Sequence, residues 1–320
     1  MKKYVVLGLA LLNLNAMAQE SLHGAVKIYD AKFVPGIVSL FVEGKMVMND
    51  GVKVKKRVTK DAVALNDNLV KVREFFRIKF NRNSFDDLGA DIRASVNVNK
   101  FAFPDILGQR QNAAWMSTRF SFGAGKRSGL DDFAQALDVV GHEFTHAIVQ
   151  STSNLKYEGQ SGALNEHMAD VFGAIINQYY NHPANPYLIG ATILKGDYKK
   201  KAEALRDMMN PEKGLSPQPS HMRDLEKPEF SKFGEACVAS GANDRCGVHS
   251  LSGIPNRVFA LTMSKLSIND TADLYYNVMT KRLKPYSKFA DYAEALRSEC
   301  QVNGQGVCTV VDDALKAVGL

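Results

Sequence analysis

The sequence predicts an α+β protein in two lobes, a β-rich amino-terminal lobe followed by a mostly helical one. Two observations lead to this prediction. Segments with strand-like patterns come first in the chain, and from Asp131 onward apolar residues recur at helical spacing. The chain has 320 residues, of which 45% are hydrophobic and 23% are charged. This length allows one large domain or two modest ones, and the composition excludes disorder and collagen-like repeats.

The β-rich region extends from about Gly24 to Gln111. Two segments in it, Ile37–Val42 and Ile92–Val98, are rich in β-branched residues and are bounded by turn residues, which is typical of strands. One helix is expected between them, because four apolar residues lie at helical spacing along one face: Leu65, Leu69, Val72 and Phe76.

Beyond this region the hydrophobic pattern predicts a series of helices. The first two extend from Asp131 to Ser151 and from Ser161 to Tyr180, each with one apolar stripe. Four later helices are expected near Ser252–Lys265, Thr271–Lys281, Lys288–Cys300 and Cys308–Val318. We therefore expect lobes at 19–152 and 153–320, with a functional site in the cleft between them.

The first 18 residues have the features of a secretory signal peptide. Two lysines follow Met1, an apolar run extends from Val5 to Leu14, and small residues flank Met17, so cleavage is expected after Ala18. The apolar run is too short to span a bilayer. Removal of this segment lowers the net charge from +6 to about +4, a surplus too small to favour nucleic acid. An exported protein without a nucleic-acid or membrane partner is predicted, and we expect a monomer.

Export affects how the four cysteines are interpreted. Cys237 lies close to Cys246 in the sequence, and Cys300 lies close to Cys308, so two local disulfides are expected in an oxidising compartment. A zinc cluster is the alternative, but neither pair has CxxC spacing. The spacing alone does not decide how the four cysteines pair.

The motif His142-Glu-Phe-Thr-His146 lies within the helix predicted from Asp131 to Ser151. A spacing of four residues places both imidazoles on one helical face, where they can bind one metal ion. Glu143 is rotated by about 100° around the helix, so it can reach a metal-bound water without being a ligand. The alternative interpretation is two surface histidines on an amphipathic helix.

The next helix supplies a third candidate ligand, which a catalytic zinc site with one open position requires. Glu166 and Asp170 are four residues apart and share a face. Glu166 is the expected ligand, while Asp170 and Asn165 are expected to support the ligating residues through hydrogen bonds. His167 is a competing ligand, although it points about 100° away from Glu166. A solvated helix face is the alternative, but the apolar neighbours indicate a buried helix.

These motifs together resemble the thermolysin-type, or M4, zinc metalloproteases. The resemblance covers nearly all of the chain after the signal segment, and it implies a two-lobed thermolysin-like fold with the active-site helix between the lobes. The segments that carry it are His142-Glu-Phe-Thr-His146, Gly162-Ala-Leu-Asn-Glu166-His-Met-Ala-Asp170, Asn112-Ala-Ala-Trp115, Tyr157, Ala204-Leu-Arg206, Asp244 with Gly247-Val-His249, and the closing Asp313–Gly319.

The resemblance implies a secreted zinc endopeptidase with one catalytic zinc ion held by His142, His146 and Glu166, acting on peptides or proteins. Zinc would polarise the peptide carbonyl and a water molecule, and Glu143 would accept the proton of that water. Tyr157 and His249 match the donors that stabilise the oxyanion, and Asp244 would orient His249. A Cys237–Cys246 disulfide would anchor the loop that carries His249. On its own, His249 could equally be a core or helix-capping histidine.

The resemblance also implies a preference for cleavage on the amino-terminal side of hydrophobic residues. Asn112 and the backbone of Ala113 would bind the substrate main chain, and Arg206 would hold a carbonyl. Burial of a Leu or Phe side chain contributes about 1.5–3 kcal/mol, which favours such residues in an apolar pocket. The residues expected to line that pocket, for which core packing is the alternative role, are Leu130, Phe133, Val139 and Leu205.

The sequence departs from the family at the usual calcium site. Asp138 matches the family pattern, but Asn177 stands where a glutamate is expected, and the loop 181–192 contains no acid. Calcium prefers six to eight oxygen ligands, several of them charged. Calcium binding is therefore expected to be weakened or lost, with the disulfides bracing the chain instead.

Two other functions are alternatives to the endopeptidase. A secreted zinc-binding adhesion or binding protein could use the same scaffold without turnover, but it would be expected to lack Glu143 or His249. An aminopeptidase would need an acidic anchor for a free amino terminus, such as a GxMEN segment before the zinc helix, and the sequence has none.

Overall fold

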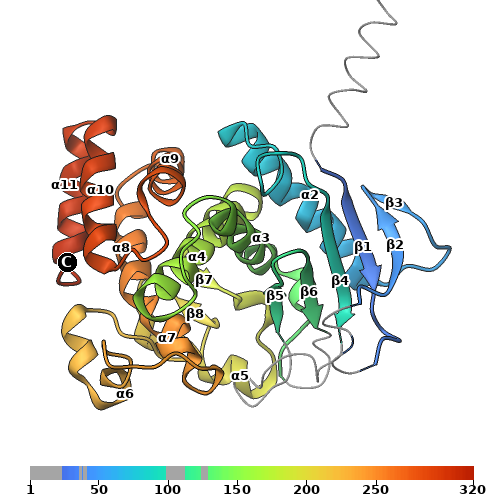
Figure 1. Cartoon of the computed structure of the whole chain (residues 1–320), viewed down its shortest axis with the longest axis horizontal. Helices are drawn as coiled ribbons and strands as arrows, with labels where there is room; N and C mark the ends of the chain where they lie inside the picture. Colours follow the sequence, from blue (N-terminus) through green and yellow to red (C-terminus); the bar gives the residue numbers. More distant parts are fainter. Residues whose placement is uncertain (1–23, 36–37, 39–41, 99–111, 124–128) are drawn as a thin grey trace, which may run out of the picture.

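The computed structural model describes residues 24–35, 38, 42–98, 112–123 and 129–320, and it confirms the predicted α+β class. The expected signal peptide lies outside the described residues. Within them, no helix has both the length and the apolar character needed to cross a membrane. Figure 1 shows the sheet and α2 at one end of the molecule, the helices α8–α11 at the other, and α3 and α4 between them.

A six-stranded mixed sheet forms the first lobe. Its order is β3-β2-β1-β4-β6-β5, in which β1 and β4 run parallel, as do β4 and β6, while the remaining pairs are antiparallel. The strands are β1 (Val26–Asp30), β2 (Lys45–Asn49), β3 (Val52–Lys53), β4 (Ile92–Val98), β5 (Ala113–Trp115) and β6 (Phe120–Gly123).

The predicted helix in this lobe is α2 (Lys60–Phe80), which packs against the sheet. Thr59 caps its amino terminus by accepting a hydrogen bond from the Ala62 N–H, and Asn81 ends it in the left-handed conformation. The four apolar residues expected on one face, Leu65, Leu69, Val72 and Phe76, are all buried.

One strand prediction was wrong wherever the structure can test it. Of the expected strand Ile37–Val42, only Val38 and Val42 lie within the described residues. The N–H of Val42 donates to the carbonyl oxygen of Val38 over 3.0 Å, which is a helical connection. Both valines are exposed, at 44% and 47%. β-branched residues favour a strand only where their side chains can pack on a half-buried surface, and these two do not.

The helices from α3 onward match the predicted series with shifted ends. The zinc-motif helix begins at Leu137 rather than Asp131, because Asp132 accepts a hydrogen bond from the Ala134 N–H and caps a separate short turn at Phe133–Gln135. The helices are α3 (Leu137–Ser151), α4 (Gly159–Asn181), α5 (Gly196–Lys201), α6 (Pro228–Ser231), α7 (Asp244–Leu251), α8 (Gly253–Met263), α9 (Ile268–Asn277), α10 (Phe289–Asn303) and α11 (Gln305–Lys316). A short two-stranded sheet pairs β7 (Leu188–Ile189) with β8 (Arg206–Asp207).

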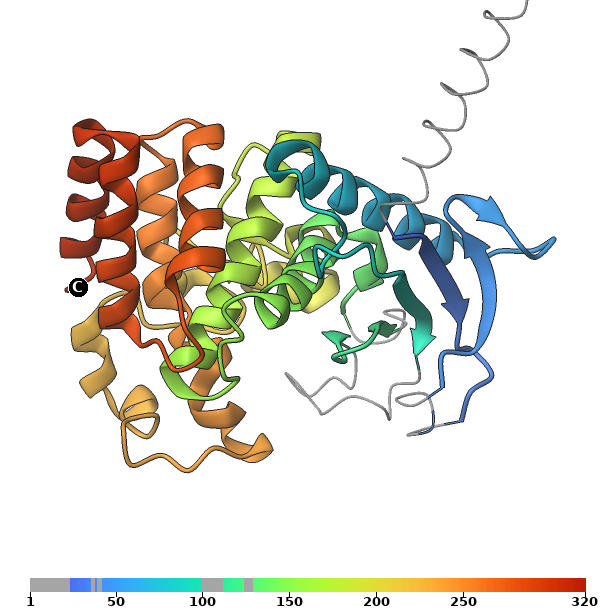
Figure 2. The same ribbon diagram turned by 45° about the horizontal axis from the view of Figure 1, so that its top comes forward.

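The carboxyl-terminal helices lie side by side in both views (Figures 1 and 2). The predicted Thr271–Lys281 helix is divided between α9 and a π-helical turn at Val278–Arg282. A disulfide between Cys300 and Cys308 joins α10 to α11, and a second disulfide joins Cys237 to Cys246. Both expected pairings are therefore confirmed.

Glycines allow α3 and α4 to approach closely. A Cβ atom built on Gly141 of α3 would lie 3.3 Å from the Cα of Gly173, and one built on Gly173 would lie 2.5 Å from the carbonyl oxygen of Asp138. Any larger residue at 173 would therefore force the helices apart. This contact determines the distance between the metal ligands, since they project from these two helices.

We expect Gly173→Ala to lower the free energy of unfolding by about 1–3 kcal/mol, because the new methyl group meets the backbone of α3. Helix propensity alone would act in the opposite direction by about 1 kcal/mol. Urea denaturation measures the difference. Gly306→Ala in α11 is the matched control, since a Cβ there meets nothing within 4 Å. Equal stabilisation by both substitutions would contradict the close-contact argument.

Candidate active site

Three potential metal ligands meet where α3 packs against α4. His142 and His146 lie one helical turn apart on α3, and Glu166 projects from α4. The two Nε2 atoms are 3.0 Å apart, and each lies 3.4 Å from a carboxylate oxygen of Glu166. Across the described residues, this is the only group of three or more histidine, cysteine or acidic side chains close enough to hold one ion.

The outer ring nitrogens of both histidines are held by oxygen atoms. The Nδ1 of His142 lies 2.8 Å from Oδ1 of Asp170, and the Nδ1 of His146 lies 2.7 Å from Oδ1 of Asn165. Because both oxygens are acceptors, each Nδ1 carries a proton, which leaves each Nε2 as the nitrogen that can bind a metal ion. The supporting contacts expected for Asp170 and Asn165 are thus present.

The converging atoms favour a bound cation. Oε2 of Glu166 is buried and has no hydrogen-bond donor. Burial opposes a charge on His142, but the carboxylates of Asp170 and Glu166 raise its pKa to about 10, which shows how negative the site is. Two imidazole nitrogens and one carboxylate are a ligand set of catalytic zinc sites. The residues therefore fit zinc, in agreement with the predicted ligands His142, His146 and Glu166.

His167, the competing ligand, lies outside this group. It is fully buried, its Nδ1 lies 2.9 Å from Oδ1 of Asn256, and its ring packs edge-on against Tyr275 and Tyr292. Burial lowers its pKa to about 4, so the ring is neutral. Of the two alternatives on this helix, Glu166 is the one that faces the histidines.

Asp170 is a buried carboxylate with four donors around it. The guanidinium of Arg206 binds it through two nitrogens at 2.8 and 2.6 Å, and the amide of Asn256 donates to it at 2.9 Å, in addition to His142. Burial alone would raise the pKa of Asp170, but Arg206 and His142 lower it far below its ordinary range. The sequence analysis did not identify Asn256. It assigned Arg206 only to binding a substrate carbonyl, and that role stays a prediction.

Glu143 is positioned by the edge strand of the sheet. Its Oε2 accepts a hydrogen bond of 2.8 Å from the backbone N–H of Trp115 on β5. Trp115 also donates through its indole nitrogen to Gln150 near the end of α3, over 2.7 Å. The candidate base therefore connects the zinc helix to the strand, a contact that no sequence pattern indicates.

Tyr157, His249 and Asp244 lie together on the open side of the ligands. The hydroxyl of Tyr157 donates to Oε1 of Glu166 and lies 3.2 Å from Nε2 of His249. Asp244 accepts from both the ring Nδ1 of His249, at 2.6 Å, and its backbone N–H, at 2.9 Å. Burial lowers the pKa of His249, but Glu166 and Asp244 outweigh it and raise the pKa. Burial and Glu166 raise the pKa of Tyr157, so its hydroxyl keeps its proton.

Comparison with known proteins agrees with this geometry. The description "thermolysin metallopeptidase, catalytic domain" matches residues 14–150, and "thermolysin metallopeptidase, alpha-helical domain" matches residues 153–320. The chain belongs to the thermolysin metallopeptidase family. The thermolysin-like fold is shared with a solved structure, the precursor of protealysin from Serratia proteamaculans, with a TM-score of 0.76, 28% identity and coverage of 93% of this chain and 88% of that one.

Curated relatives of this thermolysin-family chain are bacterial proteases. Bacillolysin of Bacillus amyloliquefaciens is 36% identical over 261 residues, which are 81% of this chain and 44% of the relative. Neutral protease NprE of Bacillus pumilus is 35% identical over 81% of this chain and 77% of its own length. An extracellular elastase of Staphylococcus epidermidis is 32% identical over 77% of this chain. The chain thus spans less than half the length of some relatives, as with bacillolysin.

In this thermolysin-family chain, the segment that carries His249 has an uncommon backbone conformation. Four consecutive residues from Asp244 to Gly247 are left-handed, with φ of 55°, 48°, 64° and 76°. Only the last is a glycine, and a non-glycine residue in this conformation costs roughly 1–2 kcal/mol. We call 244–247 the left-handed turn. The Cys237–Cys246 disulfide attaches to it.

The four residues predicted to line an apolar pocket occupy different environments. Leu130, Phe133 and Val139 are 4–6% exposed and belong to the hydrophobic core. Leu205 is half-buried and packs against Gly190, where a Cβ would lie 2.7 Å from its Cδ1. Packing within the core thus accounts for the first three, and their role in substrate binding stays a prediction.

The predicted substrate-binding strand is at the edge of the sheet. β5 is hydrogen-bonded to β6 on one side and is last in the strand order. Asn112 precedes it, and its carbonyl oxygen accepts from the Gly123 N–H at 2.9 Å, while Ala113 is nearly buried. An edge strand can accept an extended peptide through main-chain hydrogen bonds.

The two residues at the usual calcium position already have partners within the chain. Asp138 is buried, and its two carboxylate oxygens accept from the N–H groups of Val139 and Gly190 at 2.9 and 2.7 Å. The side-chain oxygen of Asn177 accepts from Asn181 at 2.8 Å. Whether calcium binds stays a prediction.

We expect Asp170→Asn to weaken zinc binding by about 10- to 100-fold, because an amide has only one acceptor oxygen for the donors that surround this side chain and leaves Arg206 without its counter-ion. Competition with a zinc chelator measures the affinity directly, without an activity assay. Asp197→Asn is the control, since Asp197 forms an exposed ion pair with Lys200. A folded Asp170→Asn protein with unchanged zinc affinity would contradict the assigned support.

Proposed function

We propose that this protein is a secreted zinc-dependent endopeptidase that cleaves peptide bonds on the amino-terminal side of hydrophobic residues. The observation that carries the proposal is the convergence of His142, His146 and Glu166, with Glu143 beside them and held by a backbone N–H. A binding protein has no need for such a base. The relatives named bacillolysin and neutral protease support the same class of activity.

Glu143 is the general base in this proposal. When bound, zinc would polarise the scissile carbonyl and make water more acidic. The Trp115 N–H orients the Glu143 carboxylate so that one oxygen remains for the attacking water. Glu143 then accepts the proton of that water and transfers it to the leaving nitrogen, which balances the reaction.

Tyr157 and His249 supply hydrogen bonds to the oxyanion that forms. Both side chains are more than one-third exposed, at 36% for Tyr157 and 39% for the side chain of His249, so a substrate can reach them. The hydroxyl of Tyr157 is a donor, and the carboxylates of Glu166 and Asp244 raise the pKa of His249, which favours its donating form. Asp244 is a positioning residue, because it touches His249 rather than the substrate.

The substrate would lie as an extra strand along the edge of β5 that, among the described residues, pairs with no other strand. Asn112 and the backbone of Ala113 would bind its main chain, and Arg206 would hold a carbonyl. The neighbouring apolar residues Leu130, Phe133, Val139 and Leu205 favour Leu or Phe after the scissile bond.

We expect Glu143→Gln to lower kcat by about 10²- to 10⁴-fold, because the amide cannot accept a proton. Hydrolysis of a blocked peptide with a central Leu or Phe measures kcat, and metal analysis checks that zinc content is unchanged. Glu158→Gln is the control, since Glu158 is an exposed acid just before α4. Retained cleavage in Glu143→Gln would exclude this residue as the base, and a parent protein without cleavage would favour the binding-protein alternative.

We expect selective removal of calcium to change the melting temperature little. Asp138 already accepts two backbone N–H groups, Asn177 is uncharged, and two disulfides brace the chain. Calorimetry with a calcium-selective chelator, under conditions in which zinc analysis shows the zinc retained, tests this expectation. A fall of more than ~8 °C would indicate a calcium site with a large share in stability.

We propose export through the amino-terminal signal segment, with cleavage after Ala18. The relative named extracellular elastase supports this localisation. Amino-terminal sequencing of protein recovered from the culture medium would start at Gln19 if this is correct.

A further inference from the structure

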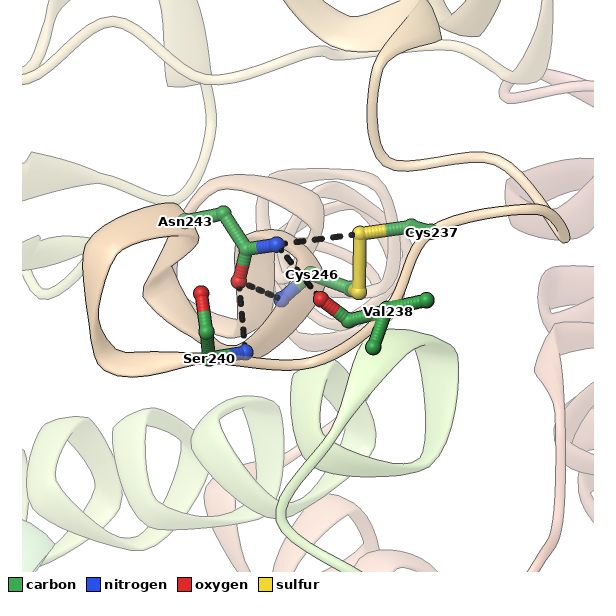
Figure 3. The surroundings of a disulfide bond; sticks show 5 residues. All are labelled: Cys237, Val238, Ser240, Asn243 and Cys246. Atoms are coloured by element: carbon green, nitrogen blue, oxygen red, sulfur yellow. Dashed lines mark hydrogen bonds between the residues drawn. A yellow bond between two sulfur atoms is a disulfide. The ribbon is translucent and has the colours of Figure 1, made fainter.

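The loop closed by Cys237 and Cys246 is tied together by one asparagine (Figure 3). The amide nitrogen of Asn243 donates to the carbonyl oxygen of Val238 at 2.8 Å, and its oxygen accepts from the N–H groups of Ser240 and Cys246 at 2.8 and 3.1 Å. Cys246 is buried and is the third residue of the left-handed turn. The disulfide therefore holds the turn at a residue whose side chain disfavours that backbone conformation.

Beyond the turn, the chain is held by a different contact. A Cβ built on Gly162 of α4 would lie 2.3 Å from Cγ1 of Val248, so Val248 packs directly on α4. This contact fixes the backbone next to His249 without help from the disulfide. Asp244, by contrast, reaches His249 only through the left-handed turn.

We propose that the Cys237–Cys246 disulfide is a positioning element of the active site, which holds Asp244 against His249 by keeping the intervening turn left-handed. The proposal rests on the endopeptidase function above. Without the disulfide, a non-glycine residue at 246 relaxes toward the right-handed conformations that it prefers, and the turn between Asp244 and His249 opens. His249 then loses both hydrogen bonds to Asp244, and its donor nitrogen is no longer oriented.

Two variants that both lack the disulfide separate the backbone effect from the loss of the covalent bond. They are C237S/C246S and C237S/C246G. Only glycine adopts the left-handed conformation without cost. We expect kcat to fall about 10- to 100-fold in the serine variant with KM little changed, and to stay within about threefold of the parent in the glycine variant. If the serine variant does not fold, the test rests on the folded glycine variant, whose kcat is expected to stay within about threefold of the parent.

C300S/C308S is the matched control, because it removes the other disulfide, which joins α10 and α11. We expect its kcat to equal that of the parent. The serine variant is also combined with H249A, where it should lower kcat no further, since both changes act through the same side chain. Full activity of the serine variant, loss of kcat in a folded glycine variant, or an additive fall in the H249A background would each overturn the proposal.

A readout independent of catalysis distinguishes this proposal from the proposed function. In protein labelled with ¹⁵N-histidine, the Nδ1–H of His249 bound to Asp244 gives a downfield proton signal, which is assigned by its loss in H249A. We expect the signal in the parent and the glycine variant and not in the serine variant. Its persistence in the serine variant would refute the positioning role, even if the parent has no peptidase activity.

Discussion

The close contact between α3 and α4 is the constraint on which the rest of the structure depends. Gly141 and Gly173 let the two backbones approach until a single added carbon would clash. Only at this separation do the imidazoles on one helix meet the carboxylate of Glu166 on the other. Because helix packing is dense and rigid, the ligand geometry is set before any metal arrives. The zinc site is thus a property of the core more than of the surface.

Charge buried behind the ligands makes this core unusual. Asp170 would be costly to bury alone, but Arg206, Asn256 and His142 surround it with donors. The ionised carboxylate in turn fixes the tautomer of His142. Removing any member leaves a buried charge or donor unpaired, so stability and metal binding depend on the same few side chains.

The open side of the site is built differently. Glu143 is oriented by a backbone N–H of the edge strand, whereas His249 depends on a left-handed turn closed by a disulfide. The ligand side is therefore rigid through packing, and the substrate side is rigid through local covalent and backbone constraints. Such strain is found where surrounding structure enforces it, often at active sites.

The sequence by itself determined what depends on neighbours along the chain: the helices and the i, i+4 pairing of His142 with His146. The expected cysteine pairs were decided by the structure. The sequence did not reveal Asn256, whose bond to Asp170 spans 86 residues, or the Trp115 contact to Glu143, because such contacts leave no periodic pattern. Local hydrogen bonding also overrode periodicity at the start of α3 and near Val38. Periodicity records which face of an element is buried, while tertiary packing decides which distant atoms meet there.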